Sequence, residues 1–275
     1  MTVFIVGLGL IGASYAERLT QQGYQVFGFD QDEQVSQQAL SDGVIKSASL
    51  ASLNQADLII SALYPNSTKA FIETNKHLFK SGAIFTDVSG VKQSVFAEVE
   101  ALLPSDVSYI SHHPMAGKAT PGYGAKDPNM FDGKNAIVIE SPQARIAQKT
   151  IIETMLKALG FATITHTSAA HHDELIAHTS QLPHILAMTL IDINKHQDVM
   201  RYTGNSYRDL TRIASINERL WSELFFANKN ALIEAVDQCI ASLQTVKSLI
   251  ESDQDNALQT WMQAVKQKRD DYENH

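Results

Sequence analysis

Near the start of this 275-residue chain lies a glycine pattern that is typical of phosphate binding, GLGLIG, directly after the apolar residues 3–6. In this pattern the first glycine permits a tight turn, the second lets the backbone approach a pyrophosphate, and the third lets a helix pack closely on a strand. The free N–H groups of the helix start would bind the phosphates. We therefore expect a dinucleotide to contact these six residues: Gly7, Leu8, Gly9, Leu10, Ile11 and Gly12.

The next apolar run, residues 25–29, is followed by Asp30. A carboxylate at this place can accept both ribose hydroxyls of NAD and would repel the additional phosphate of NADP. No Arg or Lys follows closely, so we predict NAD as the cofactor. The alternative is that Asp30 caps a helix, although Asp32 and Glu33 fit the first turn of that helix better.

Small or polar residues end three further apolar runs, in the segments SALYP (61–65), DVSGVK (87–92) and HHPMAG (112–117). Ligands of an open parallel sheet bind at the carboxyl ends of its strands. We expect Ser61 and Ser89 to contact the cofactor, and Ser89 and His113 to lie near its nicotinamide. The alternatives are a helix cap for Ser89 and a structural histidine for His113. Between the two histidines we favour His113 over His112, because Pro114 fixes the chain directly after it.

The second half of the chain contains a polar stripe on an apolar helical pattern. Ser180 and Gln181 lie four and three residues before His184, which places them on one helix face. Such a stripe is costly to bury without partners, so it indicates either a binding site or a face toward solvent or another subunit. Pro183 should kink this helix.

Arg212 lies in an apolar stretch, between Leu210 and Ala214. A guanidinium in that setting needs a carboxylate or a phosphate. The partner is either a ligand or an internal residue, Asp209 or Glu218.

Up to about residue 166, short apolar runs alternate with helical patterns, which predicts a doubly wound, mostly parallel α/β sheet of the Rossmann type over residues 1–167. From residue 168 to 275 we expect an all-α domain. The expected strands cover 3–6, 25–29, 58–62, 83–87, 107–111, 136–140 and 162–165. The expected helices include 13–22, 67–79, 144–159, 169–195, 206–214, 218–248 and 254–274. The Gly/Pro-rich segment 117–133 predicts a lid or a binding loop.

Composition narrows the classes of partner. A net charge of −8 argues against a nucleic-acid surface, and an anionic substrate would require a local positive field. No apolar run approaches the roughly 20 residues that span a bilayer. The single cysteine, Cys239, cannot form an intrachain disulfide. With no leader expected before the first strand, we predict a cytoplasmic protein that binds neither nucleic acid nor membrane.

Taken together, the motifs resemble the prephenate dehydrogenases of tyrosine biosynthesis, with the arogenate dehydrogenases as close relatives. The resemblance spans residues 1 to about 230 and rests on GLGLIG, DVSGVK, HPMAG, FDGK (131–134), HD (172–173), SQLPH (180–184) and RDLTRIA (208–214), followed by Trp221 and Asn228. It implies NAD-dependent oxidative decarboxylation of prephenate to 4-hydroxyphenylpyruvate, CO₂ and NADH. It also implies a homodimer through the helical domain.

The resemblance further implies roles for the candidate residues. His113 would accept a hydrogen bond from the ring hydroxyl while hydride leaves, and Ser89 would orient His113 and the nicotinamide. Arg212 would hold a substrate carboxylate; a grip on the leaving carboxylate would oppose its loss, whereas one on the retained carboxylate would not. His184 and Ser180 would line the side-chain end of the substrate.

Two residues depart from the family pattern at the expected substrate end. Gln181 stands where the family often has a histidine, and Lys118 where a threonine is common. Lys118 would either help neutralise a dianionic substrate or lie in solvent. We favour prephenate over arogenate, because neither an acidic group nor another hydrogen-bond acceptor is evident for the ammonium of arogenate. Two other classes fit less well: a β-hydroxyacid-type dehydrogenase, whose catalytic lysine is missing, and a non-catalytic NAD-binding sensor, which would not need Ser89, His113 and Arg212.

Overall fold

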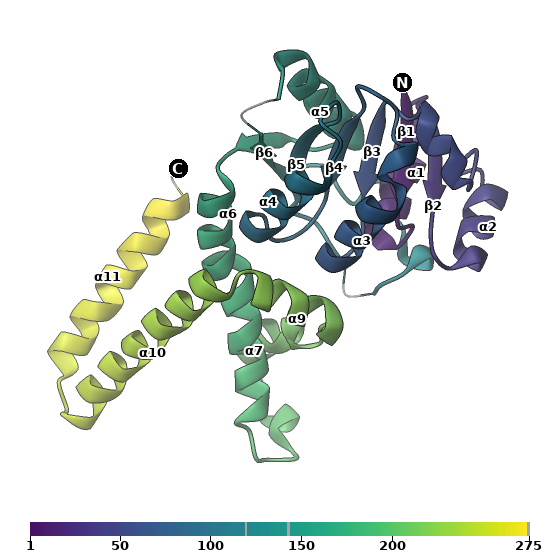
Figure 1. Cartoon of the computed structure of the whole chain (residues 1–275). Helices are drawn as coiled ribbons and strands as arrows, with labels where there is room; N and C mark the ends of the chain where they lie inside the picture. The colour runs from purple at the N-terminus through teal and green to yellow at the C-terminus, as the bar shows by residue number, and fades with distance from the viewer. Residues whose placement is uncertain (119, 142–143, 274–275) are drawn as a thin grey trace. The chain divides into compact units, whose positions relative to one another are not determined.

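A seven-stranded sheet forms the first half of the molecule in the computed structural model, which describes residues 1–118, 120–141 and 144–273 (Figure 1). The strand order is β2-β1-β3-β4-β5-β6-β7. The strands are β1 (Thr2–Val6), β2 (Gln25–Phe29), β3 (Leu58–Ser61), β4 (Ile84–Asp87), β5 (Ser108–Pro114), β6 (Asn135–Glu140) and β7 (Thr163–His166).

All seven expected strands are present, and all neighbours pair in parallel except β5 and β6. The prediction of a mostly parallel sheet is therefore confirmed. Because β1 to β5 are parallel, the segments that follow them meet at one edge of the sheet. This edge contains the glycine turn, Asp30, the DVSGVK segment and the end of β5.

Helices cover both faces of the sheet, as a doubly wound fold requires. The helices of this half are α1 (Leu10–Gln21), α2 (Glu33–Ser41), α3 (Pro65–Asn75), α4 (Gln93–Leu102) and α5 (Ile146–Leu159). Val3 and Ile5 of β1 belong to a core with residues of α1, α2 and α5. Phe4 and Val6, which point the other way, belong to a core with residues of α3 and α4. The period of two along a strand thus produces two separate cores.

The second half is helical, as expected, and its helices are α6 (Ala169–Ile176), α7 (Leu182–Asp192), α8 (Asn205–Thr211), α9 (Glu218–Ala227), α10 (Lys229–Glu251) and α11 (Asp255–Glu273). Short 3₁₀ helices are found at Leu50–Gln55, Lys76–Leu78, Tyr123–Ala125, Val199–Tyr202 and Arg212–Ala214. Residue 274, the end of the last expected helix, and residue 119, in the expected loop, lie outside the described residues.

The expected helix over 169–195 is interrupted by a π-helical turn, Ala177–Gln181. Pro183 therefore lies in the first turn of α7, where its missing N–H costs little. The expected helix over 218–248 is also divided, at Asn228, whose side chain is buried and hydrogen-bonded to residues of α6 and the π turn. The spacing of apolar residues along the chain continues through both interruptions, so the sequence pattern does not show where the helices are broken.

By their internal contacts, residues 1–229 form one compact unit and residues 230–275 form a second. The first unit includes both the sheet and α6 to α9, because Asp173 of α6 accepts hydrogen bonds from the backbone at the start of α4. The expected boundary between two domains at residues 167 and 168 therefore remains a prediction. None of the helices in the described part of the chain is both long and apolar enough to cross a membrane.

Candidate active site

The glycine turn has the geometry that its sequence predicts. Gly7 has a φ of +86°, which only glycine adopts readily. A Cβ on Gly12 would lie 1.9 Å from the Gly7 carbonyl oxygen, so this close approach of helix and strand excludes any side chain. A Cβ on Gly9, in contrast, would meet nothing within 4 Å. The turn is therefore tightly packed inside and open at Gly9, where a pyrophosphate would approach.

The start of α1 and Asp30 complete this part of the site. No side chain caps α1, whose first intrahelical bond runs from Ala13 N–H to the Gly9 carbonyl, 2.9 Å. The Asp30 carboxylate accepts Leu8 N–H at 2.8 Å and Asp32 N–H at 3.0 Å through separate oxygens. Each oxygen has a further lone pair for a ribose hydroxyl. The cap of α2 is Asp32, not Asp30. These residues fit a dinucleotide.

The two histidines of β5 point to opposite sides of the strand and have different environments. His112 is fully buried; its ring nitrogens lie 3.0 Å from Tyr15 Oη and 2.7 Å from Thr86 Oγ1. Burial lowers the pKa of His112 to about 3. His113 is partly exposed and faces α6. His112 is thus part of the core, and His113 is the histidine that a ligand can reach.

His113 belongs to a hydrogen-bonded row that links the sheet to α6. Its Nδ1 lies 2.9 Å from His172 Nε2, and His172 Nδ1 lies 2.7 Å from Asp173 Oδ1. The Asp173 carboxylate also accepts the backbone N–H groups of Lys92 and Gln93, both at 2.8 Å. We call His113, His172 and Asp173 the histidine relay. Burial, and then the positive charge of Lys92, hold the pKa of His113 well below its ordinary value, so its imidazole is neutral at pH 7.

A buried ion pair lies directly beneath the relay. Lys92 is fully buried and donates to Asp87 Oδ1 (3.0 Å), Ser111 Oγ (2.7 Å) and the His112 carbonyl (2.7 Å). Asp87 also accepts the hydroxyls of Tyr109 and Ser111. Burial alone would raise the pKa of Asp87, but Lys92 and these hydroxyls outweigh it and lower the pKa. The pair fixes the ends of β4 and β5 relative to one another.

The serines at the strand ends have less direct roles than expected. Ser61 is fully buried, and its hydroxyl is bonded to Thr68 Oγ1 at 2.8 Å, so we leave it out of the proposed cofactor contacts. Ser89 Oγ accepts Val91 N–H at 3.4 Å and so stabilises the turn before α4, but Lys92 is the cap of that helix, so the alternative of a helix cap at Ser89 is wrong. No hydrogen bond between these described residues joins Ser89 to His113.

Helix α9 lies near both His113 and His184. A Cβ built on Gly90 would lie 3.7 Å from His113 Nε2 and 3.6 Å from Leu224 Cδ2, so the glycine leaves a space of about one methyl group between Nε2 and Leu224. One turn earlier, Trp221 packs on His184, with ring centroids 3.8 Å apart. His184 Nδ1 donates to the Ile213 carbonyl at 2.8 Å. Residues of α9 therefore lie close to His113 and to His184.

Three further residues predicted to bind the substrate, Arg212, Ser180 and Lys118, have different surroundings. Arg212 is exposed and, within the described parts of the chain, has neither a hydrogen bond nor an ion pair with its side chain, so neither internal partner considered above is used. Ser180 lies half-buried in the π turn. Lys118 is exposed and paired with Asp127 at 2.8 Å. Of the two cations, Arg212 is thus the one whose side chain has no partner among the described residues.

Gln181 has a different role from the predicted one. Its amide is 1% exposed, donates to the Leu224 carbonyl at 3.1 Å and accepts Asn228 Nδ2 at 2.8 Å. All its polar atoms are thus used in holding α9 to the π turn, and we leave it out of the proposed substrate contacts. A neutral histidine likewise offers one donor and one acceptor.

The loop over residues 117–133 is attached to the first two helices. Asp127 N–H donates to Ser14 Oγ at 2.9 Å, Arg18 donates to Asn129 Oδ1 at 2.9 Å, and Tyr123 Oη donates to Asp42 at 2.8 Å. The described part of the loop is therefore held against the dinucleotide-binding half.

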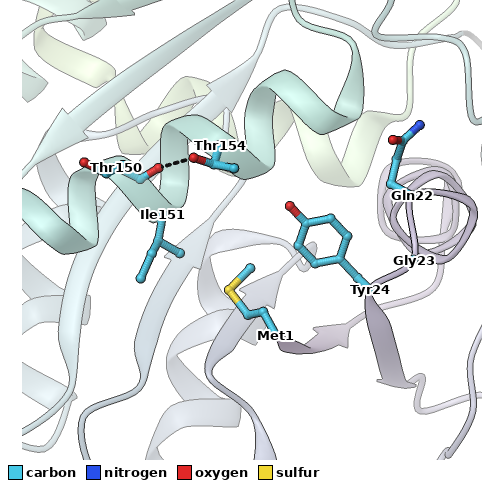
Figure 2. A pocket seen from close by; sticks show the side chains of 7 residues that line it. All are labelled: Met1, Gln22, Gly23, Tyr24, Thr150, Ile151 and Thr154. Carbon is cyan, nitrogen blue, oxygen red and sulfur yellow. Dashed lines mark hydrogen bonds between the residues drawn. The ribbon is translucent and has the colours of Figure 1, made fainter.

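A groove of about 460 Å³ is lined by Met1, Gln22, Gly23, Tyr24, Thr150, Ile151 and Thr154. Figure 2 shows these residues. Met1 and Tyr24 directly precede β1 and β2, so the groove lies at the sheet edge opposite the relay. Its lining side chains include no carboxylate, imidazole or guanidinium, and it does not contribute to the site.

Comparisons with known proteins decide the family. The model described as "Prephenate dehydrogenase, nucleotide-binding domain" matches residues 15–164, more than half of the chain, and the one described as "Prephenate dehydrogenase, dimerization domain" matches residues 168–264. The chain belongs to the prephenate dehydrogenase family. The predictions of the family, of a Rossmann-type first half, of an oxidoreductase and of NAD as its cofactor are thereby confirmed.

Individual relatives agree with this membership. The chain is 32% identical to a cyclohexadienyl dehydrogenase of Zymomonas mobilis over 271 residues, covering 92% of this chain and 90% of that protein. It is 27% identical to the prephenate dehydrogenase of Bacillus subtilis over 282 residues, covering 98% and 75%. In fold it is similar to the crystal structure of prephenate dehydrogenase from A. aeolicus in complex with hydroxyphenyl propionate and NAD+ (TM-score 0.90, 24% identity, 99% and 98% covered).

Five residues of the site had no role in the sequence analysis: His172, Asp173, Gly90, Asp87 and Lys92. The HD pair and the DVSGVK segment were noted only as motifs of the family resemblance, without a role for these residues. A consecutive His-Asp pair at the start of an otherwise apolar helix is the signal that could have indicated a buried polar contact.

Proposed function

We propose that this family member catalyses the NAD-dependent oxidative decarboxylation of prephenate to 4-hydroxyphenylpyruvate, CO₂ and NADH. The observation that supports this most strongly is a neutral, reachable histidine, His113, at the sheet edge that also contains the glycine turn and Asp30. The exposed guanidinium of Arg212 supplies the local positive charge that an anionic substrate needs in a chain of net charge −8.

His113 acts as the base. Its Nε2 accepts the proton of the ring hydroxyl while hydride leaves the carbon that bears the hydroxyl. The carbon–carbon bond to the ring carboxylate then breaks, its electrons make the ring aromatic, and CO₂ departs. The resulting phenolate oxygen recovers the proton from His113, so the imidazole is neutral again. A positioned base contributes about 10²- to 10⁴-fold to such a rate.

The cofactor is held by the first half of the chain. Gly9 and the start of α1 bind the pyrophosphate, and Asp30 accepts the ribose hydroxyls, which favours NAD over NADP. Bound NAD supplies the hydride acceptor. Ser89, through the turn that it stabilises, orients the segment beside His113. Arg212 holds a substrate carboxylate, and Ser180 and His184 line the side-chain end.

One observation favours arogenate as a second substrate. Because His184 Nδ1 donates to a carbonyl, and because burial lowers the pKa of His184, its Nε2 is an acceptor at neutral pH. An acceptor suits the ammonium of arogenate better than the keto oxygen of prephenate. The relative from Z. mobilis is named for cyclohexadienyl substrates in general.

Absorbance of NADH tests both proposals, with prephenate and arogenate each offered with NAD and with NADP. We expect the highest kcat/KM with prephenate and NAD, and measurable turnover of arogenate. In His184→Leu, the ratio of arogenate to prephenate turnover should fall. Lack of turnover with either substrate would overturn the proposed activity, and a preference for NADP would overturn the role of Asp30.

We further propose a homodimer through the helical region, in the cytoplasm. The match to a dimerization domain supports it, and so do the exposed apolar side chains that lie between residues 186 and 265: Leu186, Ile191, Ile193, Met200, Leu210, Phe226, Ile233, Ile240, Leu243, Ile250, Met262 and Val265. The lone cysteine fits a reducing compartment. Light scattering after size-exclusion chromatography should give twice the chain mass, and fractionation of the native cells tests the location.

A further inference from the structure

We propose that His172, backed by Asp173, is a positioning residue that holds His113 in the tautomer whose lone pair is on Nε2. This inference rests on the proposed function, because it explains how His113 becomes a base toward a substrate hydroxyl. It assigns a role to a side chain that is 1% exposed and therefore acts through His113 and not by touching the substrate.

The direction of the relay is set at Asp173. An ionised carboxylate only accepts hydrogen bonds, and the Asp173 oxygens already receive the N–H groups of Lys92 and Gln93. The 2.7 Å contact with His172 Nδ1 is therefore an N–H donated by the ring. With that hydrogen on Nδ1, the neutral ring has a lone pair on Nε2.

The same reasoning carries over to His113. His172 Nε2 accepts, so the 2.9 Å contact requires a hydrogen on His113 Nδ1. The lone pair of His113 is then on Nε2, beside the space that Gly90 leaves. The opposite tautomer would present an N–H to the substrate hydroxyl and could not take its proton. In hydrolases with a Ser-His-Asp triad, the carboxylate that accepts a hydrogen bond from the catalytic histidine fixes its tautomer, and losing the correct tautomer costs about 10⁴-fold in kcat.

The charges around His113 favour the neutral relay. The groups facing it are His172 from α6, the Lys92 ammonium from the start of α4, and His112 from its own strand. Burial, opposed by the hydrogen bond to Asp173, lowers the pKa of His172. A cationic His172 would donate from both nitrogens and would force the hydrogen of His113 onto Nε2. A neutral His172 is thus the condition for a basic Nε2.

Asp173 also has a structural function, because it caps the start of α4 from a distant helix. Substitution of Asp173 would therefore mix folding with positioning, and the test uses His172. His172→Gln keeps an acceptor at the ε position, whereas His172→Leu removes it at similar size. The control is His171→Leu, which changes the exposed neighbouring histidine, whose side chain pairs with Glu174 among the described residues.

The first readout is the tautomer, measured by long-range ¹H–¹⁵N correlation spectra of enzyme with ¹⁵N-labelled histidine, with the His113 signals assigned from His113→Asn. We expect a hydrogen on Nδ1 of His113 in the wild type, in His172→Gln and in His171→Leu, and on Nε2 in His172→Leu. A wild type with the hydrogen on Nε2, or an unchanged tautomer in His172→Leu, would overturn the proposal.

The second readout is turnover of prephenate. In His172→Leu we expect kcat to fall about 10²-fold, less than the full contribution of a base, while KM and NADH binding stay within a few-fold. His172→Gln should recover most of the rate. Full activity of His172→Leu in an active wild type would overturn this proposal alone. A wild type without turnover would overturn the proposed function alone, because the tautomer measurement needs no substrate.

Discussion

The glycine turn and the histidine relay lie at the same edge of one sheet, yet they are built differently. The turn consists of six consecutive residues and Asp30, and its fit depends on backbone conformation and on missing side chains. The relay joins His113 of β5 to His172 and Asp173 of α6, 59 or more residues away. Local sequence therefore specifies the first region, whereas the second exists only because two distant elements meet.

The buried charge beneath the relay should give the largest effect on stability. Lys92→Met leaves Asp87 buried without its cation, which should lower the free energy of unfolding by about 3–5 kcal/mol. Urea unfolding measures this. The control is Lys69→Met, which removes a surface pair with Glu98 and should cost at most about 1 kcal/mol. Equal destabilisation by both substitutions would contradict the structural importance of the buried pair.

Two alanine substitutions in the glycine turn should separate its effect on cofactor binding from its effect on folding. Gly9→Ala places its Cβ in open space, so the melting temperature without cofactor should stay unchanged, while the Kd for NADH rises about 10- to 10²-fold through lost backbone contacts. Gly12→Ala puts a Cβ against the Gly7 carbonyl and should lower the melting temperature itself. Calorimetry and NADH fluorescence check the pair. Wild-type affinity in Gly9→Ala would exclude this turn as the pyrophosphate site.

Arg212 lies in the helical region, away from both the glycine turn and the relay in sequence. Its guanidinium has neither a hydrogen bond nor an ion pair with the residues that the structure describes, so Arg212→Gln should leave folding unaffected. Loss of a charged contact of about 1.5–3 kcal/mol should raise KM for prephenate about 10- to 10²-fold, with kcat within a few-fold. Arg201→Gln, another exposed arginine of this region, is the control. A large fall in kcat at constant KM would instead place Arg212 in the chemical step.

The smallest expected effect is the dependence on pH. His113 must be neutral to accept a proton, and burial together with Lys92 holds its pKa well below 6.5. The kcat/KM for prephenate should therefore be flat from about pH 6.5 to 8 and should fall tenfold per unit only below the lowered pKa. The lowered pKa of His184 adds to the same acid limb. A midpoint above 6.5 would contradict a buried, neutral base.

The sequence was informative where a feature is local. The seven strands, the doubly wound sheet and the glycine turn follow from apolar runs and glycine spacing, and all appear as expected. His113 could be preferred over His112 only through its proline neighbour, although their surroundings differ completely.

Features that depend on tertiary contacts were not predictable from spacing. Ser61 and Gln181 have the right place along the chain, but their side chains are buried and fully bonded to Thr68, Leu224 and Asn228. The π turn before Pro183 and the link from Asp173 to α4 also depend on packing between elements. Helical spacing shows which residues share a face, but not which partner that face meets.

The central claim is that His113 is the base of the reaction. Stopped-flow formation of NADH in a single turnover, with NAD and prephenate both saturating, measures its step directly for the wild type and His113→Asn. The account predicts a rate about 10²- to 10⁴-fold lower in the variant, with the affinity for NADH unchanged. A single-turnover rate within a few-fold of the wild type would contradict it.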